Sequence, residues 1–308
     1  FQEHPTEQDP RVTAEVRDFM SSLPLEVTEA PPTITEEALE AALKTMKLKS
    51  APGPDGITYR LLRDLPVSAK RHLAALFTQI CTTGTYPSLW KLASVTMLPK
   101  PEKPLNQPSS YRPISLLCCL SKVFEKILLG YMRTEPIPHH QFGFRGGLST
   151  TDQLHRLVHK AAESINRKVS GLIVSLDIEA AFDRVPHPEL LYKLHRQSQP
   201  AWIVNLLHSY YSNRLFYVQV EGKLSRLYPI KAGTAQGAVI SPHLYSLYIA
   251  DQPNWDERLV DIFQYADDTA YLVVARKTHL ANEWLNAQLS ALQTWCRDWK
   301  TKINPGKS

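Results

Sequence analysis

Two adjacent carboxylates, Asp267 and Asp268, interrupt the otherwise apolar run IFQYADDTAYLVV at residues 262–274. The flanking residues favour β-strands, and the pair falls where a two-residue hairpin turn would place both acids at the rim of a sheet. Adjacent carboxylates repel each other and are costly to desolvate. A pair held close together at neutral pH is therefore expected to share protons or to bind cations. Carboxylate oxygens suit hard divalent ions such as Mg²⁺.

Asp177 is the obvious third carboxylate, because it ends the short apolar run GLIVSLD at residues 171–177, a pattern typical of a buried strand. If the two strands are neighbours, Asp177 lies beside Asp267. Three carboxylates on a β platform can hold two metal ions, which activate an attacking hydroxyl and stabilise the leaving oxygen in phosphoryl transfer. Each motif taken alone has a plainer interpretation, since Asp-Asp is also a turn pair and Asp177 is also a strand-end acid.

The rest of the sequence indicates the elements that would position these acids. Apolar residues at helical spacing predict a helix that begins near Thr35 and further helices at 68–84, 121–132, 150–165, 241–251 and 279–300. The apolar runs within 94–117 and 262–274 predict antiparallel hairpins. Helices and strands alternate irregularly, so we expect an α+β protein with a central, mostly antiparallel sheet.

The composition is compatible with several classes of protein. The 308 residues carry a formal net charge of +5, which suits a polyanionic partner but is common without one. No apolar run approaches the roughly 18 residues of a membrane span, so no membrane partner is expected. The four cysteines show no Cys-x-x-Cys spacing, which favours a reduced intracellular compartment. The first residue is not Met and INPGKS does not read as a tail, so we expect an excerpt of a longer polypeptide.

Several blocks resemble those of reverse transcriptases. YADD (265–268) is similar to their Tyr-x-Asp-Asp box, SLDIEAAFDRV (175–185) to their first catalytic motif, and AGTAQGAVISPHLYSLYIAD (232–251) to their Gln-Gly…Ser-Pro motif. The stretches APGPDGI, LPKPEKP…YRPISLL, QFGFRGGLST and LQTWCRDWKTKINPGKS resemble blocks of non-LTR (LINE-type) retrotransposon enzymes, nearest to the jockey group. The blocks keep the family order over residues 35–308. One departure is GTAQG, where relatives more often have Pro or Val before Gln236; it bears on the shape of the pocket and touches no predicted metal ligand.

The resemblance implies catalytic roles for four residues. Asp177, Asp267 and Asp268 match the metal-binding acids, which would hold two Mg²⁺ ions with Mn²⁺ as a substitute. Lys307 matches a lysine that protonates the departing pyrophosphate.

The resemblance also implies binding residues for the incoming dNTP. Lys100 and Arg112 match fingers residues that hold its triphosphate. Phe182 matches an aromatic residue that lies under the sugar and clashes with a ribose 2′-OH. Gln236 and Gly237 match positions beside the nucleotide, where glycine permits a close approach of the backbone. The plainer alternatives are a solvated basic loop for Lys100 and Arg112 and a core position for Phe182.

Nucleic-acid contacts are expected from the loop QFGFRGG, where Phe142, Phe144 and Arg145 combine aromatic stacking with phosphate contact near the template path. A structural turn is the alternative interpretation of that loop. Tyr265 would pack under the primer end.

The fold implied is the fingers and palm of a right-hand polymerase, with the YADD hairpin on the palm sheet and no thumb in this chain. We expect an extended lead-in at 1–34, an N-terminal extension and fingers with parts of the palm at 35–170, and the palm at 171–308 with motif D at its end.

The function implied is RNA-directed DNA polymerase activity in target-primed reverse transcription. The expected partners are an RNA template, a DNA primer, dNTPs, and the endonuclease and thumb of a parent polypeptide, with the nucleus as the site of action. The alternatives are an inactive copy that only binds nucleic acid and a group II intron maturase.

Overall fold

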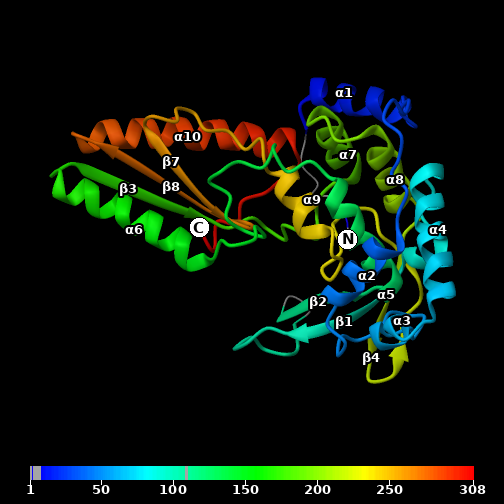
Figure 1. The fold of residues 1–308 in the computed structure, drawn as a ribbon. Helices are drawn as coiled ribbons and strands as arrows, with labels where there is room; N and C mark the ends of the chain where they lie inside the picture. The colour runs from blue at the N-terminus through cyan, green and yellow to red at the C-terminus, as the bar shows by residue number, and fades with distance from the viewer. Residues whose placement is uncertain (1, 3–7, 108–109) are drawn as a thin grey trace.

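The computed structural model describes residues 2, 8–107 and 110–308 and divides them into two lobes (Figure 1). The helices are α1 (Pro10–Ser21), α2 (Glu36–Thr45), α3 (Tyr59–Arg63), α4 (Val67–Thr83), α5 (Cys119–Leu128), α6 (Thr150–Asn166), α7 (His187–Arg196), α8 (Ala201–Tyr211), α9 (Ser241–Tyr248) and α10 (Thr278–Asp298), with 3₁₀ turns η1 (Ser88–Lys91) and η3 (Leu129–Tyr131). The strands are β1 (Leu92–Pro99), β2 (Tyr111–Leu116), β3 (Ser170–Leu176), β4 (Leu215–Val220), β5 (Lys223–Leu224), β6 (Tyr228–Pro229), β7 (Val260–Tyr265) and β8 (Asp268–Ala275). This content confirms the α+β class.

The smaller lobe is built on a three-stranded antiparallel sheet in the order β3-β8-β7. Helices α6 and α10 lie on opposite sides of it (Figure 1). The long helix α10 buries Leu285, Leu292 and Trp295, so the apolar stripe of residues 279–300 is a core face. The β3 edge stays open, since alternate residues of β3 are exposed and Ile173 is 51% exposed, so β3 is half-buried rather than the buried strand that the sequence predicted. At one end of the sheet the strands can present polar side chains.

The larger lobe contains a second sheet, in the order β2-β1-β4-β5, with β6 also paired to β4. β1 and β2 form the antiparallel hairpin predicted within residues 94–117, with Ser94 opposite Leu116. β4 joins β1 in parallel, with Leu92 opposite Leu215. The expectation of one central sheet is therefore wrong, because two sheets form, and neither periodicity nor turn residues can reveal a parallel pairing between strands so far apart in sequence.

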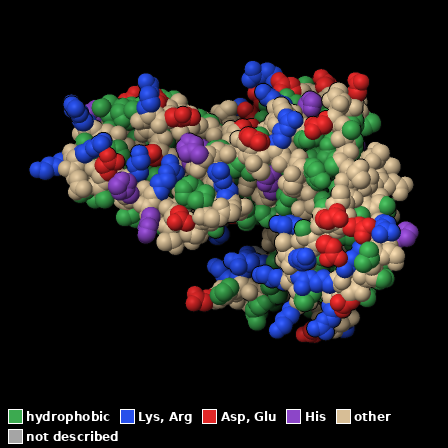
Figure 2. Space-filling view, viewed as in Figure 1, with side chains coloured by type: hydrophobic (Ala, Val, Ile, Leu, Met, Phe, Trp, Pro, Cys, Tyr) green, Lys and Arg blue, Asp and Glu red, His purple; other side chains and the backbone are tan. Residues whose placement is uncertain are grey.

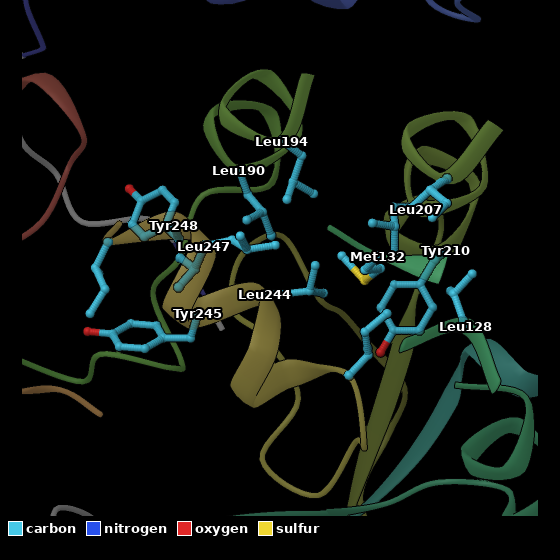
Figure 3. Packing of buried hydrophobic residues seen from close by; sticks show 14 of the residues in the cluster. Leu128, Met132, Leu190, Leu194, Leu207, Tyr210, Leu244, Tyr245, Leu247 and Tyr248 are labelled. Carbon is cyan, nitrogen blue, oxygen red and sulfur yellow. The ribbon is translucent and has the colours of Figure 1, made fainter. Parts of the chain in front are cut away.

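Helix α9 lies between the lobes and is buried on nearly all sides (Figures 1 and 3). Figure 3 shows Leu244 pointing toward α8, whereas Tyr245 and Tyr248 point the opposite way. Leu244 and Leu247 are fully buried. The Tyr248 hydroxyl donates to the Trp299 carbonyl at the end of α10, so α9 contacts both lobes and holds them together.

The expectation that residues 1–34 form an extended lead-in is wrong for Pro10–Ser21, which forms α1. Asp9 caps this helix by accepting the Arg11 N–H, and a proline opens it. Phe19 is buried and stacks on His195 of α7, with ring centroids 5.2 Å apart. Tertiary packing thus stabilises a helix that could not be predicted from the Pro- and acid-rich sequence around it. The part of the lead-in at residues 1 and 3–7 lies outside the described residues.

The expected boundary at residues 170 and 171 does not separate the two lobes. Helix α6 precedes that boundary but packs on the smaller sheet, whereas α7, α8 and β4 follow it and pack on the larger lobe. Residues 35–170 were expected to include parts of the palm, and the chain crosses between the lobes several times.

The structure also bears on the cysteines and on membrane-spanning helices. The four cysteines, Cys81, Cys118, Cys119 and Cys296, are buried and free of disulfides. In the part of the chain that the structure describes, no helix has the length and apolar character needed to cross a membrane.

Candidate active site

The β7–β8 hairpin carries the adjacent acids at its tip. Tyr265 pairs with Asp268, so Ala266 and Asp267 form the two-residue turn. Ala266 has a φ of 57°, in the left-handed region that a residue with a side chain adopts at an energetic cost. Asp268 opens β8 and is exposed, whereas Asp267 is half-buried.

Asp177 lies at the same end of the smaller sheet. β3 pairs with β8 in a register that sets Leu176 opposite Thr269. The next residue along β3 is Asp177, and the preceding residue on β8 is Asp268, so the register brings these two acids opposite each other. Asp177 thus shares one rim with the adjacent acids Asp267 and Asp268, although 90 positions separate it from Asp267 in the sequence.

Asp177 is held by the last residues of the chain. Its Oδ2 accepts a hydrogen bond from Asn304 Nδ2 at 3.0 Å and pairs with Lys307 Nζ at 3.2 Å. The backbone N–H of Asn304 donates to the Asp177 carbonyl at 2.8 Å, and Ile303 bridges to Ile178. The predicted motif D segment is therefore attached to the end of β3, with the Lys307 ammonium on the Asp177 carboxylate.

Burial, and to a smaller extent repulsion between the acids, disfavours the charged form of Asp267 at this rim. Burial raises the pKa of the Asp267 carboxyl, and the charges of Asp268 and Asp177 raise it further, while the Lys307 ammonium acts in the opposite direction. Such a group holds its negative charge at a cost. A cation placed among these oxygens would offset the repulsion.

The donor set fits a hard divalent cation, because it consists of carboxylate oxygens. As the side chains of the described residues stand, no three His, Cys, Asp or Glu side chains converge closely enough to hold one metal ion. The Asp177 carboxylate is turned to Asn304 and Lys307. The Lys307 ammonium would therefore compete with a metal ion for the Asp177 carboxylate.

An aromatic row lies beside the acids. The Phe182 ring stacks on Tyr245 with centroids 4.6 Å apart, and Phe144 meets it edge-on at 5.9 Å. Tyr245 is fully buried, and burial together with the charges of the nearby acids raises the pKa of its hydroxyl. The structure thus brings together Phe182 and Phe144, which the sequence assigned to the sugar and to the template.

Gln236 and Gly237 lie in the loop before α9 and contact two other segments. Gln236 Nε2 donates to Asp183 Oδ1 at 2.9 Å, and burial raises the pKa of that carboxyl. Gly237 has a φ of 123°, and a Cβ there would lie 2.5 Å from the Ser115 carbonyl oxygen. The close approach that requires glycine is therefore an approach to β2.

Glu125 also binds this loop, and nothing in the sequence led us to expect it in the site. Its carboxylate is buried in α5 and accepts the backbone N–H of Val239 at 2.7 Å. No sequence signal marked Glu125, because an acid on a helix is ordinarily a solvated one.

The basic residues lie on the β1–β2 hairpin. Arg112 is exposed on β2 opposite Leu98, and Lys100 directly follows β1. Burial raises the pKa of the Asp183 carboxyl, and the positive charge of Lys100 opposes that shift. Figure 2 shows Lys and Arg side chains gathered over these strands, along a hollow that opens toward the smaller lobe.

The loop between Gln141 and Leu148 meets the β7–β8 hairpin. Phe142 donates its backbone N–H to Gln264 O at 2.9 Å, and the exposed Arg145 donates to Pro138 O at 3.2 Å. Phe144 is 51% exposed. Tyr265 is half-buried at the end of β7. The loop that carries the aromatic and basic side chains predicted to contact nucleic acid therefore lies beside the hairpin that carries Asp267 and Asp268.

The site combines the acids of the β7–β8 hairpin and of the end of β3 with aromatic rings and a basic hairpin. This combination is expected of a nucleotidyl-transfer enzyme. Residues 98–308 match the family described as "Reverse transcriptase (RNA-dependent DNA polymerase)". The chain belongs to this family. Reverse transcriptases generally use divalent metal ions.

Two curated relatives from Drosophila mobile elements match most of the chain. The RNA-directed DNA polymerase from mobile element jockey of Drosophila melanogaster is 38% identical over 300 residues, covering 94% of this chain and 32% of the relative. The probable RNA-directed DNA polymerase from transposon BS of the same species is 37% identical, covering 96% of this chain and 34% of the relative. The chain thus spans about a third of the length of these relatives. These similarities confirm the resemblance to jockey-type non-LTR elements.

Proposed function

We propose that this chain is the RNA-directed DNA polymerase domain of a non-LTR retrotransposon, in which Asp177, Asp267 and Asp268 hold two Mg²⁺ ions, with Mn²⁺ as a substitute. The smaller lobe is the palm and the β1–β2 hairpin belongs to the fingers. The observation that carries the proposal is the β3–β8 register, which sets Asp177 opposite Asp268 at the rim that Asp267 also occupies.

The reaction is attack of a primer 3′-OH on the α-phosphate of a dNTP, with release of pyrophosphate. Bound divalent ions would activate that hydroxyl and offset the charge on the phosphates. Lys307, which pairs with Asp177, would donate a proton to the departing pyrophosphate. The 3.2 Å contact of Lys307 Nζ with Asp177 Oδ2 supports this role, because the ammonium lies beside a proposed metal ligand.

The incoming dNTP lies against the fingers hairpin. Lys100 and Arg112 hold its triphosphate, with the guanidinium offering two parallel hydrogen bonds and the ammonium a compact charge. Phe182 lies under the sugar, supported by its stacking on Tyr245. Gln236 and Gly237 line the pocket beside the base, supported by the attachment of their loop to Asp183 and to β2.

The RNA template and the DNA primer run through the hollow of Figure 2. Phe142, Phe144 and Arg145 contact the template, and Tyr265 packs under the primer end. An endonuclease and a thumb come from other parts of the parent polypeptide, in keeping with relatives about three times as long. Synthesis is primed at a nicked chromosomal target, which places the site of action in the nucleus.

Primer extension tests this function directly. The full chain is mixed with an RNA template, an annealed DNA primer, dNTPs and Mg²⁺, and incorporation is compared among the wild type, Asp177→Asn and Asp267→Asn. We expect incorporation by the wild type and a loss of at least about 1,000-fold in either variant, because each lacks a metal ligand. Asp64→Asn, at the exposed C-terminal end of α3, is the matched control and keeps full activity.

Binding of the primer–template without incorporation would instead identify an inert nucleic-acid-binding copy. Unimpaired incorporation by Asp267→Asn would exclude the acidic rim as the metal site.

A further inference from the structure

We propose that Gln141 is a positioning residue for Asp267: its carboxamide fixes the turn that carries this acid and thereby sets the metal affinity of the site. The inference rests on the proposed function, since it concerns the same metal ligands. Gln141 itself touches neither substrate nor ion.

The carboxamide of Gln141 bonds both backbone groups of the turn residue. Gln141 Nε2 donates to Ala266 O at 3.0 Å, and Gln141 Oε1 accepts the Ala266 N–H at 3.0 Å. The same Oε1 accepts the Gly143 N–H at 2.7 Å. Gln141 is fully buried. A buried amide with three backbone partners in two segments holds them in one relative position.

Ala266 needs such support because its φ of 57° is disfavoured for a residue with a side chain. Asp267 follows it directly, so any relaxation of Ala266 toward ordinary backbone angles would turn the Asp267 carboxylate away from Asp177. Gln141 satisfies both polar groups of Ala266 in the disfavoured conformation. It therefore stabilises the one arrangement of the turn in which the acids share a rim.

The backbone on either side of Gln141 reinforces the contact. Phe142 N–H donates to Gln264 O and Gln264 N–H donates to His140 O, so this segment lies beside β7 as a short parallel bridge. A Cβ on Gly143 would lie 2.1 Å from Ala266 N. Only glycine allows the loop to come close enough for Gln141 to reach the turn.

Phe144 and Arg145 follow directly in the same loop. A loop that is proposed to contact the template is therefore attached, through Gln141, to the residue before a proposed metal ligand. Residues that orient ligands in this way typically change metal affinity by about 10-fold to 100-fold when they are mutated.

The test measures metal binding without turnover. Mn²⁺ is titrated into the full chain, free Mn²⁺ is followed by electron paramagnetic resonance, and Tm is recorded for each protein. Gln141→Met keeps the length of the side chain and removes its hydrogen bonds. The matched control is Gln288→Met, because Gln288 is also fully buried and bonds two backbone groups, Trp255 N and Pro253 O, away from the hairpin turn.

We expect Gln141→Met to weaken Mn²⁺ binding about 10-fold or more. Gln288→Met should keep the wild-type affinity for Mn²⁺, although both variants should have a lower Tm than the wild type. Equal affinity for the two variants, or an unchanged affinity for Gln141→Met, would overturn the inference. If Gln141→Met does not fold, Gln141→Asn carries the test, because it retains an amide that is one methylene too short to reach Ala266.

Asp267→Asn separates this inference from the proposed function. If Asp267→Asn loses Mn²⁺ binding and Gln141→Met does not, only the positioning role fails. If the wild type binds no Mn²⁺, or Asp267→Asn binds it as the wild type does, both the metal site and the positioning role fail.

Discussion

Phe182 shows how one side chain of this site is held by its neighbours. Its ring lies on the buried Tyr245 ring and is met edge-on by Phe144, so its position is limited from two directions. An aromatic ring fixed in this way can reject a ribose 2′-OH by steric clash rather than by moving aside.

Replacing Phe182 with valine should open space for the 2′-OH. We expect the ratio of kcat/KM for dNTP to kcat/KM for the matching rNTP to fall about 10-fold to 100-fold, the effect of one lost steric contact. Single-nucleotide incorporation on an RNA template measures both values. Phe182→Tyr keeps the ring and should leave the ratio nearly unchanged; an equal fall in the two variants would argue against a steric gate.

Which site residues the sequence could reveal depends on how local their signals are. Asp177, Asp267 and Asp268 stand out because carboxylates at the ends of apolar strands are unusual. Gln141, Asn304 and Glu125 carry no such signal, because their importance comes from hydrogen-bond partners more than 100 residues away in sequence. Only the folded register shows what a buried glutamine bonds.

Helices α7, α9 and α10 meet around a buried cation. Lys193 of α7 donates to Tyr248 O at 2.7 Å and to Asp251 Oδ1 at 2.5 Å, and its ammonium lies 4.1 Å from the centre of the Trp299 ring. Burial lowers the pKa of Lys193 to about 8, although the Asp251 carboxylate opposes the shift. The ordinary pKa of lysine is 10.5.

A depressed lysine pKa predicts how stability changes with pH. Between pH 8 and 10.5 the unfolded chain binds the Lys193 proton while the folded chain has released it, so the free energy of unfolding should rise with pH. We expect the wild type to gain roughly 2 kcal/mol from pH 8 to pH 10 relative to Lys193→Met. Urea denaturation at several pH values measures this difference. Parallel pH profiles of the two proteins would show that Lys193 keeps its proton in the folded state.

Secondary structure was predictable where the pattern lies within one segment. The hairpins, the strand ending at Asp177 and the amphipathic helices α4, α6 and α10 follow from periodicity. Helix α1 and the β1–β4 pairing do not, because the first depends on packing against α7 and the second joins Leu92 to Leu215.

The two lobes enclose a hollow in which basic side chains should meet phosphates (Figure 2). Arg145 is exposed on the loop beside the acids. If it contacts one phosphate, Arg145→Ala should reduce the slope of log K against log salt by about 1 for binding of an RNA–DNA primer–template. Fluorescence anisotropy at a series of salt concentrations measures this slope.

The control for that measurement is Arg258→Ala. Arg258 is also exposed to solvent but pairs with Asp256 at 2.9 Å in the loop before β7. Its slope should match that of the wild type. A change of slope in both variants would indicate a general effect of net charge rather than a contact in the hollow.

The parallel pairing of β1 with β4 also determines when this molecule can finish folding. On the ribosome, the β1–β2 hairpin emerges long before Val220 does, and until then one edge of β1 has no partner. Meanwhile β3 is synthesised and must wait for β8. Both sheets are therefore completed late in synthesis, when β4 and β8 pair with strands made earlier. Nascent chains that stop short of residue 220 expose an unpaired strand edge, which favours aggregation.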